Sequence, residues 1–120
     1  MANILVVDDS FYMRTMLKNI LTDAGHHVIG EAPNAEVAIK MVKELNPDLV
    51  TLDVILPDNT GLEVLKIIKE QVPHMKVVMV SAVGQNMIVE EALALGALDY
   101  IVKPFSEDKV VSALGKIFVS

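Results

Sequence analysis

The sequence predicts a doubly wound α/β domain, a flavodoxin-like (βα)5 sandwich in which helices cover both faces of a parallel sheet. Short β-branched runs alternate with longer segments of helical spacing along the 120 residues, as in repeated βα units. Runs such as "ILVV" and "VVMV" are apolar at every position, as strands buried on both faces must be. The expected order of the five parallel strands is 2-1-3-4-5, because that is the flavodoxin-like form of the doubly wound sheet.

Five segments have the composition of buried strands. Each is rich in valine, isoleucine or leucine, and each is short enough to be a strand rather than a helix. Turn or capping residues separate each one from the helical segment that follows. The predicted strands span residues 3–8, 27–31, 48–53, 76–81 and 99–103.

A helix is predicted after each strand, because apolar residues recur there every three or four positions. Gly25 and Gly96 mark the ends of the first and fourth helices, and Pro47 and Pro73 lie just beyond the second and third. The residues expected to face the core, helix by helix, are Met13, Leu17, Ile20 and Leu21; Val37, Ala38, Met41 and Val42; Leu62, Leu65, Ile68 and Val72; Val89, Ala92, Leu93 and Gly96; and Val110, Val111, Leu114 and Phe118.

The composition excludes several classes of function. Apolar residues make up 52% of the chain and charged residues 22%, which is typical of a soluble globular domain. The net charge of -6 disfavours nucleic acid and anionic membranes as direct partners. The sequence has no cysteine, which excludes disulfides and thiolate catalysis. Because it also has no signal-peptide pattern and no long apolar run, we expect a cytoplasmic protein.

Polar residues stand at the carboxyl ends of four predicted strands. The first strand ends in Asp8 and Asp9, the third in Asp53, the fourth in Ser81 and the fifth in Lys103. Because the carboxyl ends of parallel strands meet at one edge, we expect these side chains to converge. Ligands of such sheets bind beside the switch in strand order, which here lies between the first and third strands.

The chemistry of this cluster indicates phosphoryl transfer assisted by a metal. Three neighbouring carboxylates repel one another unless a cation neutralises them. An all-oxygen cluster without histidine or cysteine favours Mg²⁺. Lys103 and Ser81 could contact the phosphoryl oxygens, and Asp53 would be the nucleophile. A structural alternative is that Asp9 or Ser10 caps the first helix, which leaves the other residues free to bind metal.

Four stretches together resemble the receiver domain of two-component response regulators. They are "VVDDS", "TLDVILPDNTG", "VSA" and "GALDYIVKPF", and the resemblance runs from residue 3 to about residue 118. It implies one receiver domain over residues 1–120, without an effector domain. The domain is similar to stand-alone chemotaxis-type receivers.

The resemblance implies a role for each residue of the metal site. Asp53 matches the phosphoacceptor, and Asp8 and Asp9 match the acidic pair that holds Mg²⁺. In this family the residue equivalent to Asp9 ligates the metal directly, and the residue equivalent to Asp8 acts largely through water. Asp53 and the backbone carbonyl of Ile55 complete the protein ligands.

The resemblance also implies a switch. Ser81 matches the hydroxyl residue that contacts the phosphoryl group, and Lys103 matches the family lysine. Tyr100 matches the aromatic residue that fills space vacated when phosphorylation draws the loop after Ser81 inward. The bond before Pro104 is cis in the family, whereas the sequence alone would have predicted trans. Ile55 and Val83 are apolar at the mouth of the site and cannot orient water, which implies a long-lived phosphorylated form.

The expected function is a response regulator of chemotaxis or motility signalling. A chemotaxis-type sensor histidine kinase would phosphorylate Asp53. An output protein, either a motor switch or an adaptor, would then bind the face formed by the fourth helix, fifth strand and fifth helix. The protein would be a monomer and a switch rather than an enzyme, although it would catalyse its own phosphoryl transfer and dephosphorylation. The alternatives are a phosphorelay shuttle and a regulator of a non-motility complex.

Three other classes of protein fit the sequence less well. A haloacid-dehalogenase-like phosphatase needs a second aspartate where this chain has Ile55. A flavodoxin-type FMN carrier needs a phosphate cradle where this chain has "DDSF", which would repel phosphate. A degenerate receiver would lack site residues, and all of them are present here.

Overall fold

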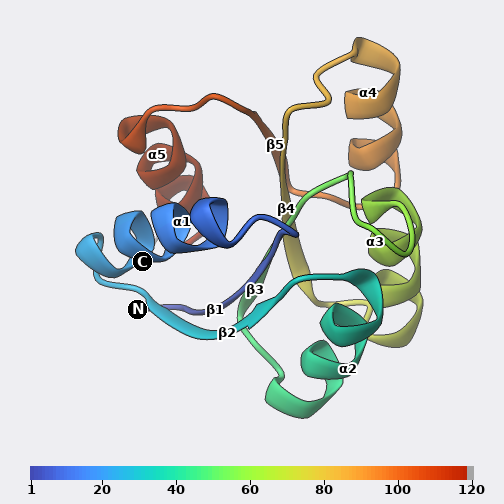
Figure 1. Ribbon diagram of the computed structural model, residues 1–120, viewed down its shortest axis with the longest axis horizontal. Helices are drawn as coiled ribbons and strands as arrows, with labels where there is room; N and C mark the ends of the chain where they lie inside the picture. The colour runs from blue at the N-terminus through green and yellow to red at the C-terminus, as the bar shows by residue number, and fades with distance from the viewer. Residues whose placement is uncertain (119–120) are drawn as a thin grey trace.

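The computed structural model describes residues 1–118, in which five strands and five helices alternate (Figure 1). Serine or asparagine side chains cap three of the helices, and Thr60 caps a fourth. The elements are β1 (Asn3–Val7), α1 (Phe11–Asp23), β2 (His27–Ala32), α2 (Ala35–Leu45), β3 (Leu49–Leu52), α3 (Gly61–Gln71), β4 (Lys76–Ser81), α4 (Asn86–Ala94), β5 (Asp99–Val102) and α5 (Glu107–Ile117).

The strands form one parallel sheet in the order β2-β1-β3-β4-β5, which confirms the predicted fold class and topology. Three strands stop one residue earlier than predicted, so that Asp8, Asp53 and Lys103 follow their strands directly. Each of these residues still donates its backbone N–H to a neighbouring strand. They therefore lie at the carboxyl edge of the sheet, at the point where its hydrogen bonding ends.

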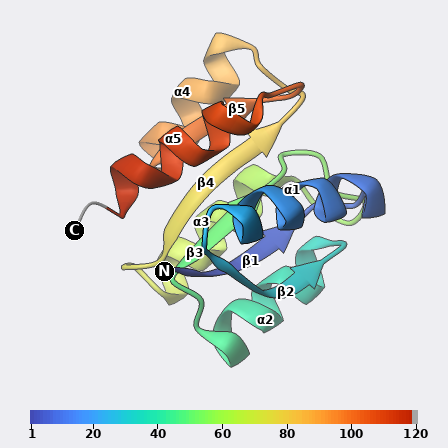
Figure 2. The same ribbon diagram turned by 90° about the vertical axis from the view of Figure 1, so that its left-hand side faces the viewer.

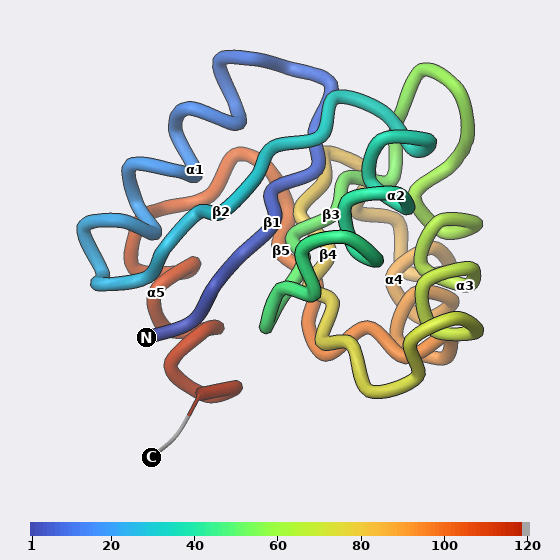
Figure 3. Tube along the Cα trace, turned by 90° about the horizontal axis from the view of Figure 1, so that it is seen from below, coloured from blue at the N-terminus to red at the C-terminus, as the bar shows by residue number. Residues whose placement is uncertain are grey.

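The helices form two layers, with the sheet between them. Helices α1 and α5 lie on one face, and α2, α3 and α4 lie on the other (Figures 1 and 3). Figure 2 shows α1 and α5 in front of the strands. In the described part of the chain, no helix is both long enough and apolar enough to span a membrane.

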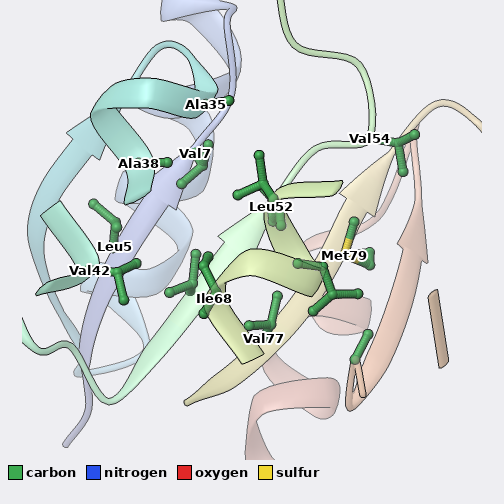
Figure 4. Close-up of a cluster of buried hydrophobic side chains, with 14 of the residues drawn as sticks. Leu5, Val7, Ala35, Ala38, Val42, Leu52, Val54, Ile68, Val77 and Met79 are labelled. Carbon is green, nitrogen blue, oxygen red and sulfur yellow. The ribbon is translucent and has the colours of Figure 1, made fainter. Parts of the chain in front are cut away.

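Each face of the sheet has its own apolar core. The core under α2, α3 and α4 includes Leu52, Ile68 and Met79 (Figure 4). The core under α1 and α5 includes Leu17 and Leu114. The strand residues are apolar toward both layers, and for this reason their runs show no alternation.

The prediction that Leu93 and Val111 face the core is wrong. Leu93 and Val111 are 46% and 40% exposed. The sheet-facing side of α5 carries Val110, Ala113 and Leu114, and this spacing turns Val111 toward solvent. In α4 the small residue Ala92 is the buried position, so the next residue along the helix, Leu93, points away from the core.

Candidate functional site

Three carboxylates meet at the carboxyl edge of the sheet, as the sequence predicted. Ligand oxygens of Asp8, Asp9 and Asp53 all lie within 4.8 Å of one another. Asp8 and Asp53 follow the adjacent strands β1 and β3, and their side chains are buried. Asp9 is exposed, so the cluster has two buried carboxylates and one that faces solvent.

Lys103 bridges the two buried carboxylates. Its Nζ lies 2.6 Å from Asp8 Oδ2 and 2.9 Å from Asp53 Oδ2. Burial lowers the pKa of Lys103, but the hydrogen bonds to these two carboxylates outweigh it, and the pKa is raised. Burial also raises the pKa of Asp8, despite the hydrogen bonds from Lys103 and the Ser10 amide. One ammonium group therefore compensates three carboxylates incompletely, and the cluster favours a further cation.

The turn after β1 holds Asp8 and leaves Asp9 facing outward. Asp8 Oδ1 accepts from the Ser10 amide at 2.9 Å, and Ser10 Oγ accepts from an amide in the first turn of α1. Ser10 is therefore the cap of α1, which leaves Asp9 available as a ligand. Arg14 donates to the Asp8 carbonyl at 2.7 Å and pairs with Glu31 on β2 at 3.2 Å.

Arg14 and Glu31 were missed by the sequence analysis. No spacing in the sequence marks Arg14, because it contacts a backbone carbonyl before its helix and a side chain on β2. No local pattern in the sequence indicated its partner, Glu31.

The loop after β3 is held close to Asp53. Asp53 Oδ1 accepts from the Ile55 amide at 3.1 Å, and the Gly61 amide donates to the Val54 carbonyl at 2.6 Å. A Cβ at Gly61 would lie 2.0 Å from the Asp53 carbonyl oxygen, so only glycine allows this close approach. Ile55 is 58% exposed at the mouth of the site.

Ser81 and Tyr100 both contact Val83. Ser81 is fully buried, and its Oγ accepts from the Val83 amide at 3.2 Å. The Tyr100 hydroxyl donates to the Val83 carbonyl. Tyr100 is buried in this structure, and burial raises its pKa. Its role in the switch stays a prediction.

The carboxylate cluster fits a hard metal ion. All its donors are oxygen atoms, and a carboxylate oxygen has two lone pairs, so Asp8 and Asp53 can accept more than the bonds described above. The exposed Asp9 gives an ion access from solvent. The cluster could therefore hold a metal ion between the ends of β1 and β3.

Comparisons with known proteins point to one family. Residues 4–115 match the response regulator receiver domain. Chemotaxis protein CheY of Thermotoga maritima is 46% identical over 114 residues, with 95% of each chain covered. CheY of Listeria monocytogenes is 47% identical over 116 residues, covering 97% of this chain and 98% of the relative.

A solved structure agrees with the sequence relatives. The crystal structure of the CheX–CheY–BeF3–Mg²⁺ complex from Borrelia burgdorferi superposes with a TM-score of 0.94 at 36% identity. The match covers 98% of this chain and 90% of that chain.

Proposed function

The chain belongs to the response regulator receiver domain family, and from this premise we propose that it is a phosphorylation-activated switch of chemotaxis signalling, with Asp53 as the phosphoacceptor. The observation that carries the proposal is the Lys103 bridge between Asp8 and Asp53, beside the exposed carboxylate of Asp9. Phosphoryl transfer to a carboxylate requires a buried nucleophile, a fixed cation and an open acidic site.

The proposed reaction moves a phosphoryl group from a kinase phosphohistidine to Asp53. A carboxylate oxygen of Asp53 attacks phosphorus, the P–N bond breaks, and the imidazole leaves and takes up a proton. Lys103, already 2.9 Å from Asp53, would offset charge on the phosphoryl oxygens. The hydroxyl of Ser81 would donate to one of them. Water later hydrolyses the acyl phosphate.

Mg²⁺ is the proposed cofactor. Asp8, Asp9, Asp53 and the Ile55 carbonyl would hold it, with Asp9 as the direct ligand of the acidic pair. When bound, the ion would add positive charge beside the phosphoryl oxygens. The support for this ion in particular is the oxygen-only donor set and the net repulsion of three carboxylates around one ammonium.

The proposed output surface is the face of α4, β5 and α5. The exposed apolar side chains on these elements are Met87 at 82%, Leu93 at 46%, Val102 at 43% and Val111 at 40%. Val83 links this face to the site, because its backbone amide donates to Ser81 Oγ and its backbone carbonyl accepts from the Tyr100 hydroxyl. A phosphoryl group that engages the Ser81 hydroxyl would change this linkage and, through it, the affinity of the face for a partner.

The proposed partners are a chemotaxis-type histidine kinase and an output protein, either a motor switch or an adaptor. The family relatives and the apolar face support this choice. The cytoplasmic location and the monomeric state stay predictions.

Incubation with Mg²⁺ and acetyl phosphate tests the proposal, with intact mass as the readout. We expect wild type to gain one phosphoryl group, and Asp53→Asn or wild type in EDTA to gain none. A degenerate receiver would gain none under any condition. An equal gain by wild type and Asp53→Asn would contradict the assignment of Asp53.

A further inference from the structure

We propose that Asp58 is a positioning residue that ties the loop between β3 and α3 to the first turn of α2, and so fixes the Ile55 carbonyl beside the acidic cluster. The inference rests on the proposed function, because the Ile55 carbonyl matters there as a metal ligand. Asp58 itself would touch neither the metal nor the phosphoryl group. No pattern in the sequence indicates a role for it.

The tie consists of two hydrogen bonds. Asp58 Oδ1 accepts from the Ala35 amide at 2.8 Å, and Oδ2 accepts from the Glu36 amide at 3.0 Å. The cap residue Asn34 accepts from the Val37 amide at 2.9 Å. The free amides at the start of α2 are therefore shared between its own cap and a loop residue more than 20 positions away.

This tie connects the two halves of the acidic site. The Asp8 amide donates to the carbonyl of Ala32 at 3.1 Å, and Ala32 ends the strand that leads into α2. Asp58 then links the start of α2 to the loop that carries Ile55. The turn after β1 and the loop after β3 are thus held at a fixed separation through α2, in addition to their contact within the sheet.

The bonds are suited to this role. An ionised carboxylate forms stronger bonds to amides than a neutral acceptor does, and the start of a helix favours negative charge. The amides of Ala35 and Glu36 lower the pKa of Asp58, so the carboxylate is ionised at neutral pH. The loop's own contacts, the Ile55–Thr60 bridge and the Gly61–Val54 hydrogen bond, close it on itself, whereas Asp58 anchors it to another element.

The experiment compares four variants by calorimetric Mg²⁺ titration. Asp58→Ala removes both bonds, and Asp58→Asn keeps one acceptor oxygen without the charge. Asn34→Ala uncaps α2 without releasing the loop. Asp48→Ala, at the start of β3, removes an equal charge and a side-chain acceptor, because Asp48 Oδ2 accepts from the Asn3 amide at 2.8 Å.

We expect Asp58→Ala to weaken Mg²⁺ binding about tenfold, as loss of an outer-shell partner does, and Asp58→Asn to lie between Asp58→Ala and wild type. Asp48→Ala should stay within about twofold of wild type, because the charge of the exposed, distant Asp48 is screened. Asn34→Ala should do the same, because Asp58 keeps both of its bonds to α2. In the metal-free protein, amide hydrogen exchange should quicken at Ile55 in Asp58→Ala but not in Asn34→Ala.

Several outcomes would overturn the inference. One is a loss in Asn34→Ala as large as in Asp58→Ala, because helix stability would then be the cause. A loss in Asp48→Ala equal to that in Asp58→Ala would make the lost negative charge, and not the tie, the cause. Asp58→Ala that binds Mg²⁺ as tightly as wild type, or that shows unchanged hydrogen exchange at the Ile55 amide, would also overturn the inference. Either result would leave the proposed function intact. Wild type that binds no Mg²⁺ would instead contradict the proposed function.

Discussion

Replacing Lys103 with methionine tests how the site balances its charges when no metal is bound. The Lys103 side chain is 13% exposed, and its ammonium group lies within 3 Å of two carboxylates that are themselves almost fully buried. Methionine keeps most of the side-chain volume but removes the charge. Asp8 and Asp53 then face each other and Asp9 without a cation.

The expected cost is about 3–5 kcal/mol in the free energy of unfolding at neutral pH, because one partner of a buried ion pair is lost and the other stays buried. With a urea dependence of about 2 kcal/mol per molar, the midpoint of unfolding falls by roughly 2 M. Mg²⁺ at about 100 times its dissociation constant restores about 2.7 kcal/mol, because the ion binds only the folded state.

The loss of stability in Lys103→Met should depend on pH, and it should be larger at high pH. Burial already raises the pKa of Asp8, and loss of Lys103 raises it further. The folded variant then binds a proton that the unfolded chain releases, so its stability falls as the pH rises from the unfolded to the folded pKa. The gap between wild type and variant should therefore be smaller at about pH 5 than at about pH 8.

The assay is urea unfolding in EDTA, followed by far-ultraviolet circular dichroism because the chain has no tryptophan. Lys40→Met is the control, since Lys40 is 74% exposed and 3.9 Å from Glu44. It should change stability by less than about 0.5 kcal/mol. A Lys103→Met midpoint equal to that of wild type, or a gap that narrows as the pH rises, would refute the reasoning.

Three further predictions concern other parts of the molecule. Thr51→Val should raise the free energy of unfolding by about 1 kcal/mol, because the buried Thr51 hydroxyl has no partner in residues 1–118; an unchanged urea midpoint would contradict this. Ile55→Asn combined with Val83→Glu should shorten the life of the phosphorylated form, because polar groups at the mouth can orient water. Decay followed by intact mass checks this, and equal decay in wild type argues against it. Gly61→Ala should weaken Mg²⁺ binding, because a Cβ there would lie 2.0 Å from the Asp53 carbonyl oxygen and the loop must move; a calorimetric affinity equal to wild type would show that the close approach is dispensable.

The sheet and its acidic edge could be predicted because their signals are local. Uninterrupted apolar runs mark strands buried on both faces, and the polar residue that ends each run lies at the carboxyl edge of the sheet. Asp8, Asp53 and Lys103 come together for this reason, although they are up to 95 positions apart. The metal and the roles of the individual site residues stay predictions that the proposed experiments address.

Other features depended on contacts that no local pattern records. Asp58 reads as an ordinary loop residue, and its role arises only when the loop meets the start of α2. Leu93 was misplaced because a helix with one small buried residue has a narrow inward face. The inward position of Tyr100 depends on the conformation of the loop that carries Val83, which composition does not determine.

Locating the phosphoryl group tests the assignment of Asp53 as the phosphoacceptor. Wild type treated with acetyl phosphate and Mg²⁺ is reduced with borohydride, which converts an aspartyl phosphate to homoserine, and its peptides are sequenced by tandem mass spectrometry. We expect homoserine at position 53 alone. Homoserine at Asp8 or Asp9 instead, or an unmodified Asp53 in protein that has bound Mg²⁺, would contradict it.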